Sequence, residues 1–525
     1  MFKILTPMKA DCCRSFPHRL RHRILTSTVL ATSIVLLQAL GTHAFEPEST
    51  PRPNIIFIMA DDMGYGDAGC YNSNSKIPTP HIDRLATEGM RFTDAHAPAA
   101  VRVPTRYGLM TGRYPFRAKR AGGSLIEPGR LTIASQLRSN GYRTGMVGKW
   151  HLGFDGVAAT QPNEETKRKK KRGRGKNLDY TKPLRGGPVD HGFDEYFGIP
   201  ASLDIPPYFY VRNDRAVQPP SNRIEANNSN SAGWSPIQGA FWREGGVAPD
   251  FNHADVTPRF TKEAVAFLKR TQAETSDKPF FLYLAFPSPH TPWMPTKEFE
   301  GKTKAGMYGD FMHQVDSSVG QLLKTLDELS VADNTLVIFT SDNGPVWYPH
   351  DAERFDHASV GPLRGMKGDA WDGGHRMPFI ARWPAQISKA TISDEVICHT
   401  DMLATFTAII GKQLPDDAGE DSFSILPVLL GKNRSDPVRE AVVHQSSGGR
   451  VLSIRQGEWK LIPTLGSAGF SKPRKVDPKP GGPIGQLYNM KTDRAEQKNL
   501  YSQHPDIVKR MTDLLERYKS AGRSR

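Results

Sequence analysis

Residues 54–62 read Asn-Ile-Ile-Phe-Ile-Met-Ala-Asp-Asp, and this stretch decides the fold. Its unbroken apolar run is typical of a strand that is buried on both faces of a mostly parallel sheet. Three later runs have the same character, at residues 145–147, 279–286 and 335–340. We therefore predict an α/β fold in which helices sandwich a large mixed, mostly parallel sheet.

Polar residues follow each of these runs. They are Asp61-Asp62, Lys149-Trp150-His151, Pro289-His290 and Ser341-Asp342-Asn343-Gly344. Because ligands bind at the carboxyl ends of strands in open α/β sheets, we expect these clusters to converge on one crevice. An Asp pair after a single strand indicates no more than a turn. The second pair, Asp342-Asn343, favours a set of hard oxygen ligands suited to Ca²⁺ or Mg²⁺ rather than to zinc.

The rest of the chain divides into recognisable parts. Residues 80–90 have the apolar spacing of a helix, and residues 154–254 are rich in Gly, Pro, Asn and charge, which is typical of long surface insertions. We place one large domain, which carries the predicted sheet, at residues 53–411. A small C-terminal α+β subdomain is predicted at 412–525, with strands at 440–444 and 451–462 and a closing helix at 502–520.

The N-terminus has the pattern of an export signal. Six basic residues precede an apolar stretch from Ile24 to Leu40, and Thr-His-Ala follows at 42–44. This pattern predicts a signal at residues 1–44, with an uncleaved anchor as the alternative. Export implies the periplasm, the extracellular space or a lysosome. Cys70 and Cys398 then remain, and the sequence does not show whether they pair.

The formal net charge of +14 is concentrated in two segments. One is the predicted signal. The other is the run from Lys167 to Lys176, in which eight of ten residues are basic, including Lys167, Arg168, Lys169, Lys170, Lys171 and Arg172. This run predicts either contact with a polyanion such as a sulfated polysaccharide or a solvated loop. The export signal and the lack of interleaved aromatic residues argue against nucleic acid.

The segment from Val101 to Arg113 resembles the signature of the sulfatase family, which reads Cys or Ser-x-Pro-Ser/Thr-Arg followed by a short helix that ends in Thr-Gly-Arg. Further segments resemble other blocks of that family in the same order, from about residue 53 to 516. They are Pro53–Asp67, Thr79–Ala86, Gly148–Gly153, Ser341–Gly344, Gly365–Gly374, Arg455–Ile462 and Leu487–Met490.

The resemblance implies an arylsulfatase-like fold of the alkaline phosphatase superfamily and hydrolysis of a sulfate ester on a small molecule or polysaccharide. It implies that Asp61, Asp62, Asp342 and Asn343 bind Ca²⁺, with Mg²⁺ as the alternative. It also implies that Arg106 holds the nucleophile. Lys149, His151, His290 and Lys367 would bind the sulfate group, and one of them would protonate the leaving group.

The position of the family's nucleophile, a Cys or Ser that is oxidised to formylglycine, is occupied by Arg102. A guanidinium is neither a nucleophile nor a cation ligand, so we predict little or no turnover. Near the metal site, Arg102 should either repel the cation or replace its charge by pairing with Asp61 or Asp342. Three explanations of the arginine stay open. It is natural, in a degenerate sulfatase kept for binding; it marks a recently inactivated enzyme or an error in the sequence; or it was introduced deliberately to trap substrate. One alternative function is a non-catalytic binder of sulfated glycans, and a less favoured one is a phosphodiesterase-type hydrolase that uses Thr105.

Overall fold

The computed structural model describes residues 52–119, 123–159, 178–228, 233–448 and 450–525. The predicted export signal at 1–44 and the basic run at 167–176 lie outside these residues. None of the helices in the described part of the chain combines the length and apolar character needed to cross a bilayer. Cys70 and Cys398 are both free thiols.

An eleven-stranded mixed sheet forms the centre of the molecule, as predicted. Its parallel core consists of the neighbours β12, β1, β11, β3 and β6, and β13 runs antiparallel to both β12 and β2. In spatial order the strands are β14 (Thr391–Ser393), β2 (Met90–His96), β13 (Arg376–Arg382), β12 (Thr335–Ser341), β1 (Asn54–Ala60), β11 (Phe280–Ala285), β3 (Arg143–Lys149), β6 (Glu195–Ile199), β7 (Val211–Arg212) and β8 (Arg215–Ala216), and β15 (Ile397–Cys398) pairs with β2.

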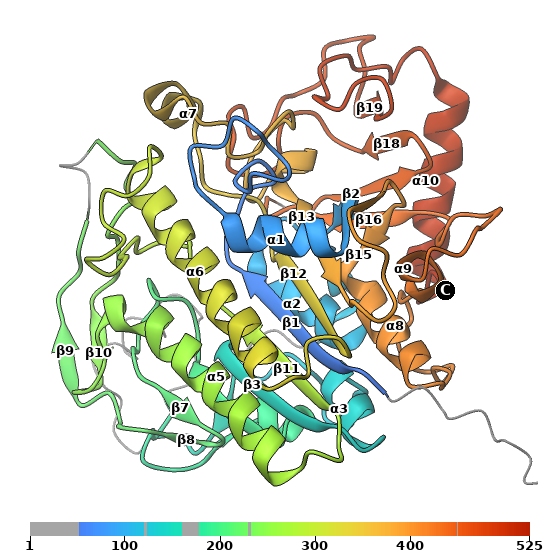
Figure 1. Cartoon of the computed structure of the whole chain (residues 1–525). Helices are drawn as coiled ribbons and strands as arrows, with labels where there is room; N and C mark the ends of the chain where they lie inside the picture. The colour runs from blue at the N-terminus through green and yellow to red at the C-terminus, as the bar shows by residue number, and fades with distance from the viewer. Residues whose placement is uncertain (1–51, 120–122, 160–177, 229–232, 449) are drawn as a thin grey trace, which may run out of the picture. The chain divides into compact units, whose positions relative to one another are not determined.

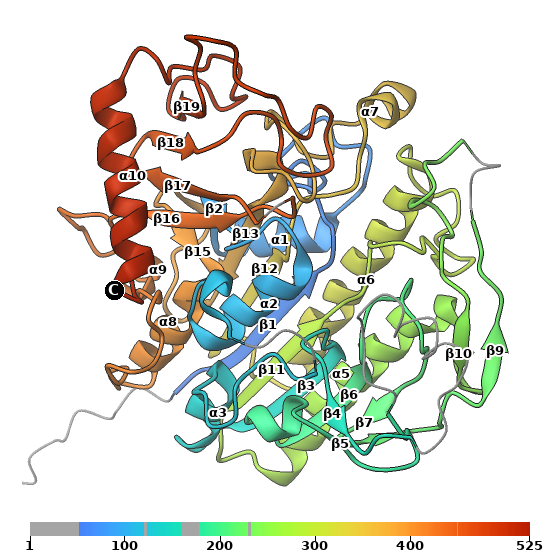
Figure 2. The same cartoon turned by 180° about the vertical axis from the view of Figure 1, so that it is seen from behind.

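Helices cover both faces of this sheet (Figures 1 and 2). One face carries α1 (Pro80–Glu88), α5 (Val256–Glu274) and α6 (Gly306–Glu328), and the other carries α2 (Arg102–Thr111), α3 (Ile133–Arg138) and α8 (Met402–Ile409). Successive side chains of β1 alternate between the two layers. Ile55, Phe57 and Met59 pack with α2, α3 and α8, whereas Ile56 and Ile58 pack with α1, α5 and α6. Burial on both sides explains why this strand is apolar throughout.

The predicted helix at residues 80–90 ends two residues early, at Glu88. The reason is Gly89, where a β-carbon would lie 2.3 Å from the carbonyl oxygen of Ala381 in β13. Only glycine allows so close an approach of the two backbones, and the chain turns there into β2. This strand was not predicted.

The C-terminal part forms a second, antiparallel sheet of β16 (Val442–Gln445), β17 (Leu452–Gln456), β18 (Trp459–Ile462) and β19 (Gln486–Asn489). Helix α10 (Pro505–Ser520) packs its apolar stripe, including Met511 and Leu514, against this sheet. The predicted small α+β subdomain is therefore present. Shorter elements complete the described fold: β4 (Asp155–Gly156), β5 (Leu184–Arg185), β9 (Asn222–Ile224), β10 (Gly245–Val247), α7 (Pro349–Phe355) and α9 (Leu426–Leu429).

Candidate active site

The parallel strands β12, β1, β11 and β3 end side by side and bring the polar clusters together. Asp61 follows β1 and Asp342 follows β12, and the amide of Asp342 donates to the carbonyl of Ala60 at 3.2 Å. Lys149 closes β3, and His290 lies in the loop after β11. The expected convergence at one edge of the sheet is thus formed.

Three carboxylates and one amide lie within this edge with almost no exposure to solvent. Asp61, Asp342 and Asn343 are fully buried, and Asp62 is 3% exposed. Asn343 Nδ2 donates to Asp62 Oδ1 at 2.6 Å. However, Asp61 Oδ1 and Asn343 Oδ1 have no hydrogen-bond partner. Buried oxygen acceptors without a donor are costly. Their position among further carboxylates fits the ligand set of a hard divalent cation.

Buried cations compensate the carboxylates. Lys149 Nζ donates to Asp61 and, at 2.7 Å, to Ser202 Oγ. Lys367 Nζ donates to both oxygens of Asp62, at 2.6 Å for Oδ2. Both lysines are at most 2% exposed. Buried charges of this kind persist in proteins only when they are paired and hydrogen-bonded.

Arg106, in the first turns of α2, ties three of the strand ends together. Its Nη2 lies 2.7 Å from Asp342 Oδ2 and 3.2 Å from Asp61 Oδ2, and its Nη1 donates to the Lys149 carbonyl at 2.9 Å. The resemblance implied that Arg106 holds the nucleophile of the family. Arg106 and Arg102 both carry hydrogen-bond donors only and cannot pair with each other, so this role stays a prediction. In the structure the side chain of Arg106 holds the carboxylates of Asp61 and Asp342.

Burial shifts the pKa values of two members of this cluster, Asp62 and Lys149, toward neutrality. It raises the pKa of Asp62 to about 6, with Asp61 and Asp342 adding to the rise against the opposing charge of Lys367. Burial also lowers the pKa of Lys149 to about 7, with Asp61 opposing and Arg102 and Arg106 assisting. Groups with such values can exchange protons near neutral pH, as general acids and bases must.

Both predicted histidines, His290 and His151, have a pKa well below the usual value. His290 is 4% exposed, and burial together with Lys367 and Arg102 lowers its pKa well below the usual value. Burial and the nearby charge of Lys149 do the same to the pKa of His151, whose Nδ1 is buried without a partner. His151 (φ 57°) and Asp62 (φ 65°) both adopt the left-handed backbone conformation. Such strained residues occur preferentially at functional sites.

Arg102 is the first residue of α2, and its side chain reaches the site. Its Nη1 lies 3.2 Å from His290 Nε2. Because His290 Nδ1 lies 2.6 Å from the Thr291 carbonyl and donates to it, Nε2 is free to accept from the guanidinium. The anticipated pairing with Asp61 or Asp342 is absent from the described residues, so this part of the prediction was wrong. Those carboxylates are already held by Arg106 and Lys149.

A cavity of about 190 Å³ opens above this cluster. Of the predicted site residues, Asp62, Arg102, His290 and Lys367 line it, whereas the other predicted residues are not part of its wall. Pro289, next to the predicted His290, also lines the cavity. The remaining wall comes from positions that the sequence analysis did not single out, namely Asp204, Ile237, Phe241, Arg243, Thr291, Trp293, Tyr308, Val346 and Phe470.

Asp204 is the most informative residue that sequence reasoning missed. It is 4% exposed, and Arg243 Nη1 donates to its Oδ2, while its Oδ1 has no partner and lies 3.9 Å from His290 Nδ1. No local pattern marks it, since it lies in an irregular segment after β6. Its buried, unpartnered oxygen at the cavity is the only signal, and that signal needs coordinates.

Thr105 does not face the cavity. Its side chain is fully buried, and its hydroxyl donates to the Ala99 carbonyl at 2.9 Å. It is not among the residues that line the cavity. The alternative of a hydrolase with Thr105 as the nucleophile is therefore contradicted by the geometry, because attack requires an accessible oxygen next to the substrate.

Comparison with known proteins agrees with this architecture. A model of the sulfatase family matches residues 53–412. The N-acetylgalactosamine-6-O-sulfatase of Bacteroides thetaiotaomicron is 34% identical over 514 residues, which cover 90% of this chain and 94% of that protein. Human arylsulfatase A is 32% identical over 450 residues, covering 83% of this chain and 79% of that enzyme.

A solved structure from work on glycosaminoglycan metabolism by Bacteroides thetaiotaomicron gives the same result in three dimensions. It superposes with a TM-score of 0.75 at 33% identity and covers 90% of this chain and 100% of its own. With a family model that spans most of the described residues and relatives above 30% identity over most of their length, the chain belongs to the sulfatase family.

Proposed function

We propose that this protein has the site of a sulfuric ester hydrolase that recognises a sulfated carbohydrate, and that it binds this ligand with little or no turnover. The proposal rests on the cavity, where basic side chains meet the Asp204 carboxylate, one oxygen of which has no hydrogen-bond partner. The cavity lies above the buried cluster of carboxylate and amide oxygens. The relatives named N-acetylgalactosamine-6-sulfatase support a sulfated amino sugar as the ligand class.

Asp61, Asp62, Asp342 and Asn343 would hold Ca²⁺, with Mg²⁺ as the alternative. The unpartnered Asp61 Oδ1 and Asn343 Oδ1 support this assignment, because a hard cation would satisfy both. When bound, the cation would neutralise charge on the sulfate oxygens. Lys149 and Lys367 already pair with the same carboxylates, so cation binding would free these ammonium groups for the ligand.

The sulfate group would lie between Lys367 and His290, both of which line the cavity. The Lys367 ammonium is a preorganised donor for anionic oxygens. His290 uses its Nδ1–H on the Thr291 carbonyl and accepts from Arg102 at Nε2, so His290 would act on the sulfate through the guanidinium of Arg102. Lys149 and His151, which are not part of the cavity wall, would bind the sulfate from the side of the carboxylate cluster. Because burial lowers the pKa of Lys149 to about 7, this side chain is suited to hold or deliver a proton near neutral pH.

The sugar would contact the outer wall. Asp204 Oδ1 is free to accept hydrogen bonds from ring hydroxyls, and Arg243 holds the other oxygen of the same carboxylate. Phe241 and Trp293 add apolar surface to this side of the cavity. A few convergent polar groups on an otherwise apolar wall are typical of small-molecule sites.

Arg102 stands where the family carries its nucleophile. A guanidinium has no nucleophilic lone pair and cannot become formylglycine, so the catalytic group would be missing while the binding groups remain. Its contact with His290 at the cavity wall adds one more donor for an anion. This contact favours the alternative named in the sequence analysis, in which a protein with Arg102 binds sulfated glycans without catalysis.

Two measurements test the proposal. A tryptic mass map should show cleavage after Arg102, whereas a cysteine or formylglycine mass would mean that the arginine is a sequence error. Calorimetry of the protein with N-acetylgalactosamine 6-sulfate in Ca²⁺ should show binding at least tenfold tighter than that of N-acetylgalactosamine. Equal affinity for the two sugars would refute a sulfate-reading site.

Two further predictions extend the proposal beyond the described residues. We propose export to the periplasm, the extracellular space or a lysosome, directed by residues 1–44. We also propose that the basic run at 167–176 contacts the sulfated polymer. Affinity for the polymer should then fall steeply with added salt, and deletion of 167–176 should remove that salt dependence.

A further inference from the structure

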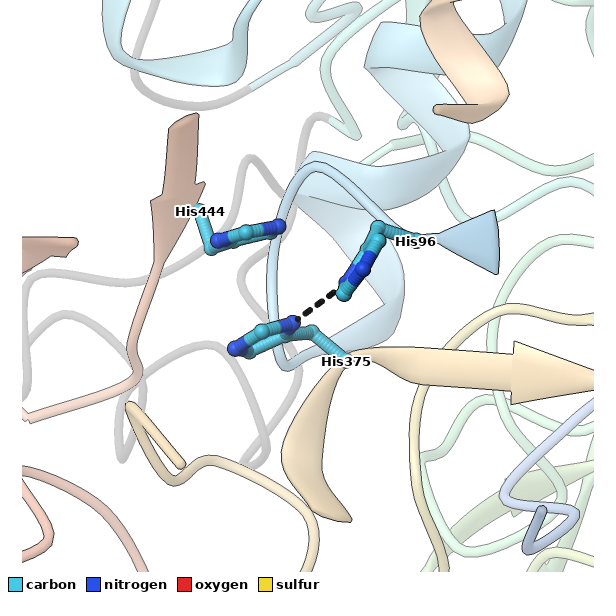
Figure 3. Close-up of side chains that lie close together, drawn as sticks. All are labelled: His96, His375 and His444. Atoms are coloured by element: carbon cyan, nitrogen blue, oxygen red, sulfur yellow. Dashed lines mark hydrogen bonds between the residues drawn. The ribbon is translucent and has the colours of Figure 1, made fainter. Parts of the chain in front are cut away.

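A second cluster of side chains lies where the central sheet meets the C-terminal strands. It consists of His96 at the end of β2, His375 directly before β13 and His444 in β16 (Figure 3). His96 and His375 are fully buried, and His444 is 1% exposed. Three imidazoles that converge from three separate strands without access to solvent require a physical explanation.

Two of the rings present a nitrogen to each other, and the third ring stacks on one of them. His96 Nδ1 and His375 Nδ1 are 3.2 Å apart. The ring of His444 stacks on that of His375 at 3.8 Å, and its centroid lies 4.7 Å from that of His96. One nitrogen from each ring can be chosen so that all three lie within 4.8 Å of one another.

Hydrogen bonding alone satisfies two of the three rings. Lys460 Nζ lies 3.2 Å from His375 Nε2, so His375 Nδ1–H could donate to His96 Nδ1, and His96 Nε2–H to Asp94 Oδ1 at 2.7 Å. This series of hydrogen bonds does not include His444. Both of its ring nitrogens are buried and have no hydrogen-bond partner. A neutral imidazole offers one donor and one acceptor, and leaving both unpaired in the interior costs free energy.

A second arrangement places the protons of His96 and His375 on their Nε2 atoms and leaves both Nδ1 atoms as acceptors. His96 Nε2–H donates to Asp94, and His375 Nε2–H donates to the Ala370 carbonyl at 3.3 Å. The Nδ1 lone pairs of both rings then lie 3.2 Å apart without a proton between them, and a bound cation would stabilise this arrangement. Two nitrogens each about 2.0–2.1 Å from a tetrahedral zinc ion are roughly 3.3 Å apart, close to the observed separation.

We infer that His96, His375 and His444 form a binding site for one transition-metal ion of the zinc class, separate from the oxygen-rich cluster at the cavity. Imidazole ligands favour zinc over calcium, just as the carboxylates of the first cluster favour calcium. His444 would complete the site by a rotation that brings one unpartnered nitrogen to the ion. A water molecule could take the fourth position.

The surroundings fit such a site. Asp94 orients His96 as carboxylates orient zinc-binding histidines in general. The positive charge of Lys460 is compensated, because its Nζ lies 2.7 Å from Asp372 and 2.8 Å from Glu496.

The ion would link β2 and β13 of the central sheet to β16 of the C-terminal sheet. Its effect would be structural, since the three ligands are not among the residues that line the cavity. A zinc ion held by residues far apart in the sequence stabilises the folded state, because the unfolded chain offers no preformed site.

The test uses the full chain, stripped with a chelator and then given excess Ca²⁺ so that the carboxylate cluster is occupied. One equivalent of ZnCl₂ should remain bound through gel filtration, at one zinc per chain by elemental analysis, and should raise the melting temperature. His444→Phe should weaken zinc binding at least tenfold. His191→Phe, which replaces a buried histidine outside the cluster, should leave zinc binding unchanged.

Three outcomes would overturn the site. They are no retained zinc in the wild type, unchanged zinc affinity in His444→Phe, and loss of zinc in Asp62→Asn, which alters only the carboxylate cluster. If His444→Phe fails to fold, zinc-edge X-ray absorption of the wild-type protein decides. The site predicts scattering from three imidazoles, and a spectrum with oxygen ligands only would contradict it.

Discussion

Replacement of Arg106 by methionine tests whether the carboxylate cluster is held by buried charge. The side chain of Arg106 is 1% exposed and donates to Asp342, Asp61 and the Lys149 carbonyl. Methionine keeps much of the volume but removes every donor. Breaking a buried ion pair from one side leaves an uncompensated charge and costs about 3–5 kcal/mol. We expect the free energy of unfolding to fall by about this amount in chelator.

The assay is urea unfolding followed by tryptophan fluorescence, with and without Ca²⁺. Ca²⁺ should recover part of the loss, because a cation at the cluster supplies the missing positive charge. Arg223→Met is the matched control. Arg223 pairs with Glu244 at 2.9 Å, but their side chains are 50% and 37% exposed, so we expect a change of about 0–1 kcal/mol. A loss for Arg106→Met no larger than that of the control would refute the reasoning.

Three further predictions concern other groups. Burial raises the pKa of Glu496 to about 7 from 4.5, so the folded state binds the extra proton between these values and this group's contribution to stability falls as pH rises through that window; Glu496→Gln should remove the fall in urea titrations between pH 4.5 and 7. Burial raises the pKa of Cys398 to about 11 from 9.0, so alkylation at pH 8 should be roughly 100-fold slower in the folded than in the unfolded protein, and equal rates would contradict this. Asp204→Asn should weaken binding of the sulfated sugar at least tenfold in calorimetry and leave inorganic sulfate unaffected, whereas equal losses for both would place Asp204 with the sulfate.

The sequence predicted those elements whose own hydrophobic pattern identifies them. The apolar run at residues 54–60 matches β1 in both its ends because that strand is buried on both faces. Strand β2 was missed because Arg91, Thr93 and Asp94 interrupt its apolar character. Asp94 is nevertheless buried, because Arg376 and Arg455 from distant segments pair with it.

The residues of the candidate site likewise include some that could be predicted from the sequence and some that could not. Ligands at the ends of parallel strands, such as Asp61 and Asp342, could be predicted because strand order places them together. Asp204 could not, because its position depends on how an irregular segment packs over the sheet. The histidine cluster could not be predicted from the sequence either. No motif joins His96, His375 and His444, and they meet only when the two sheets pack together.

We propose that one residue, Arg102, separates a complete sulfate-binding site from a working sulfatase. The most direct test compares the wild-type protein with Arg102→Cys, the latter matured by a formylglycine-generating enzyme and checked by mass. Both are assayed for sulfate release from a chromogenic aryl sulfate and from N-acetylgalactosamine 6-sulfate. We predict release by the matured variant on at least one substrate and none above background by the wild type. Comparable turnover by the wild type, or an inert matured variant, would contradict the claim.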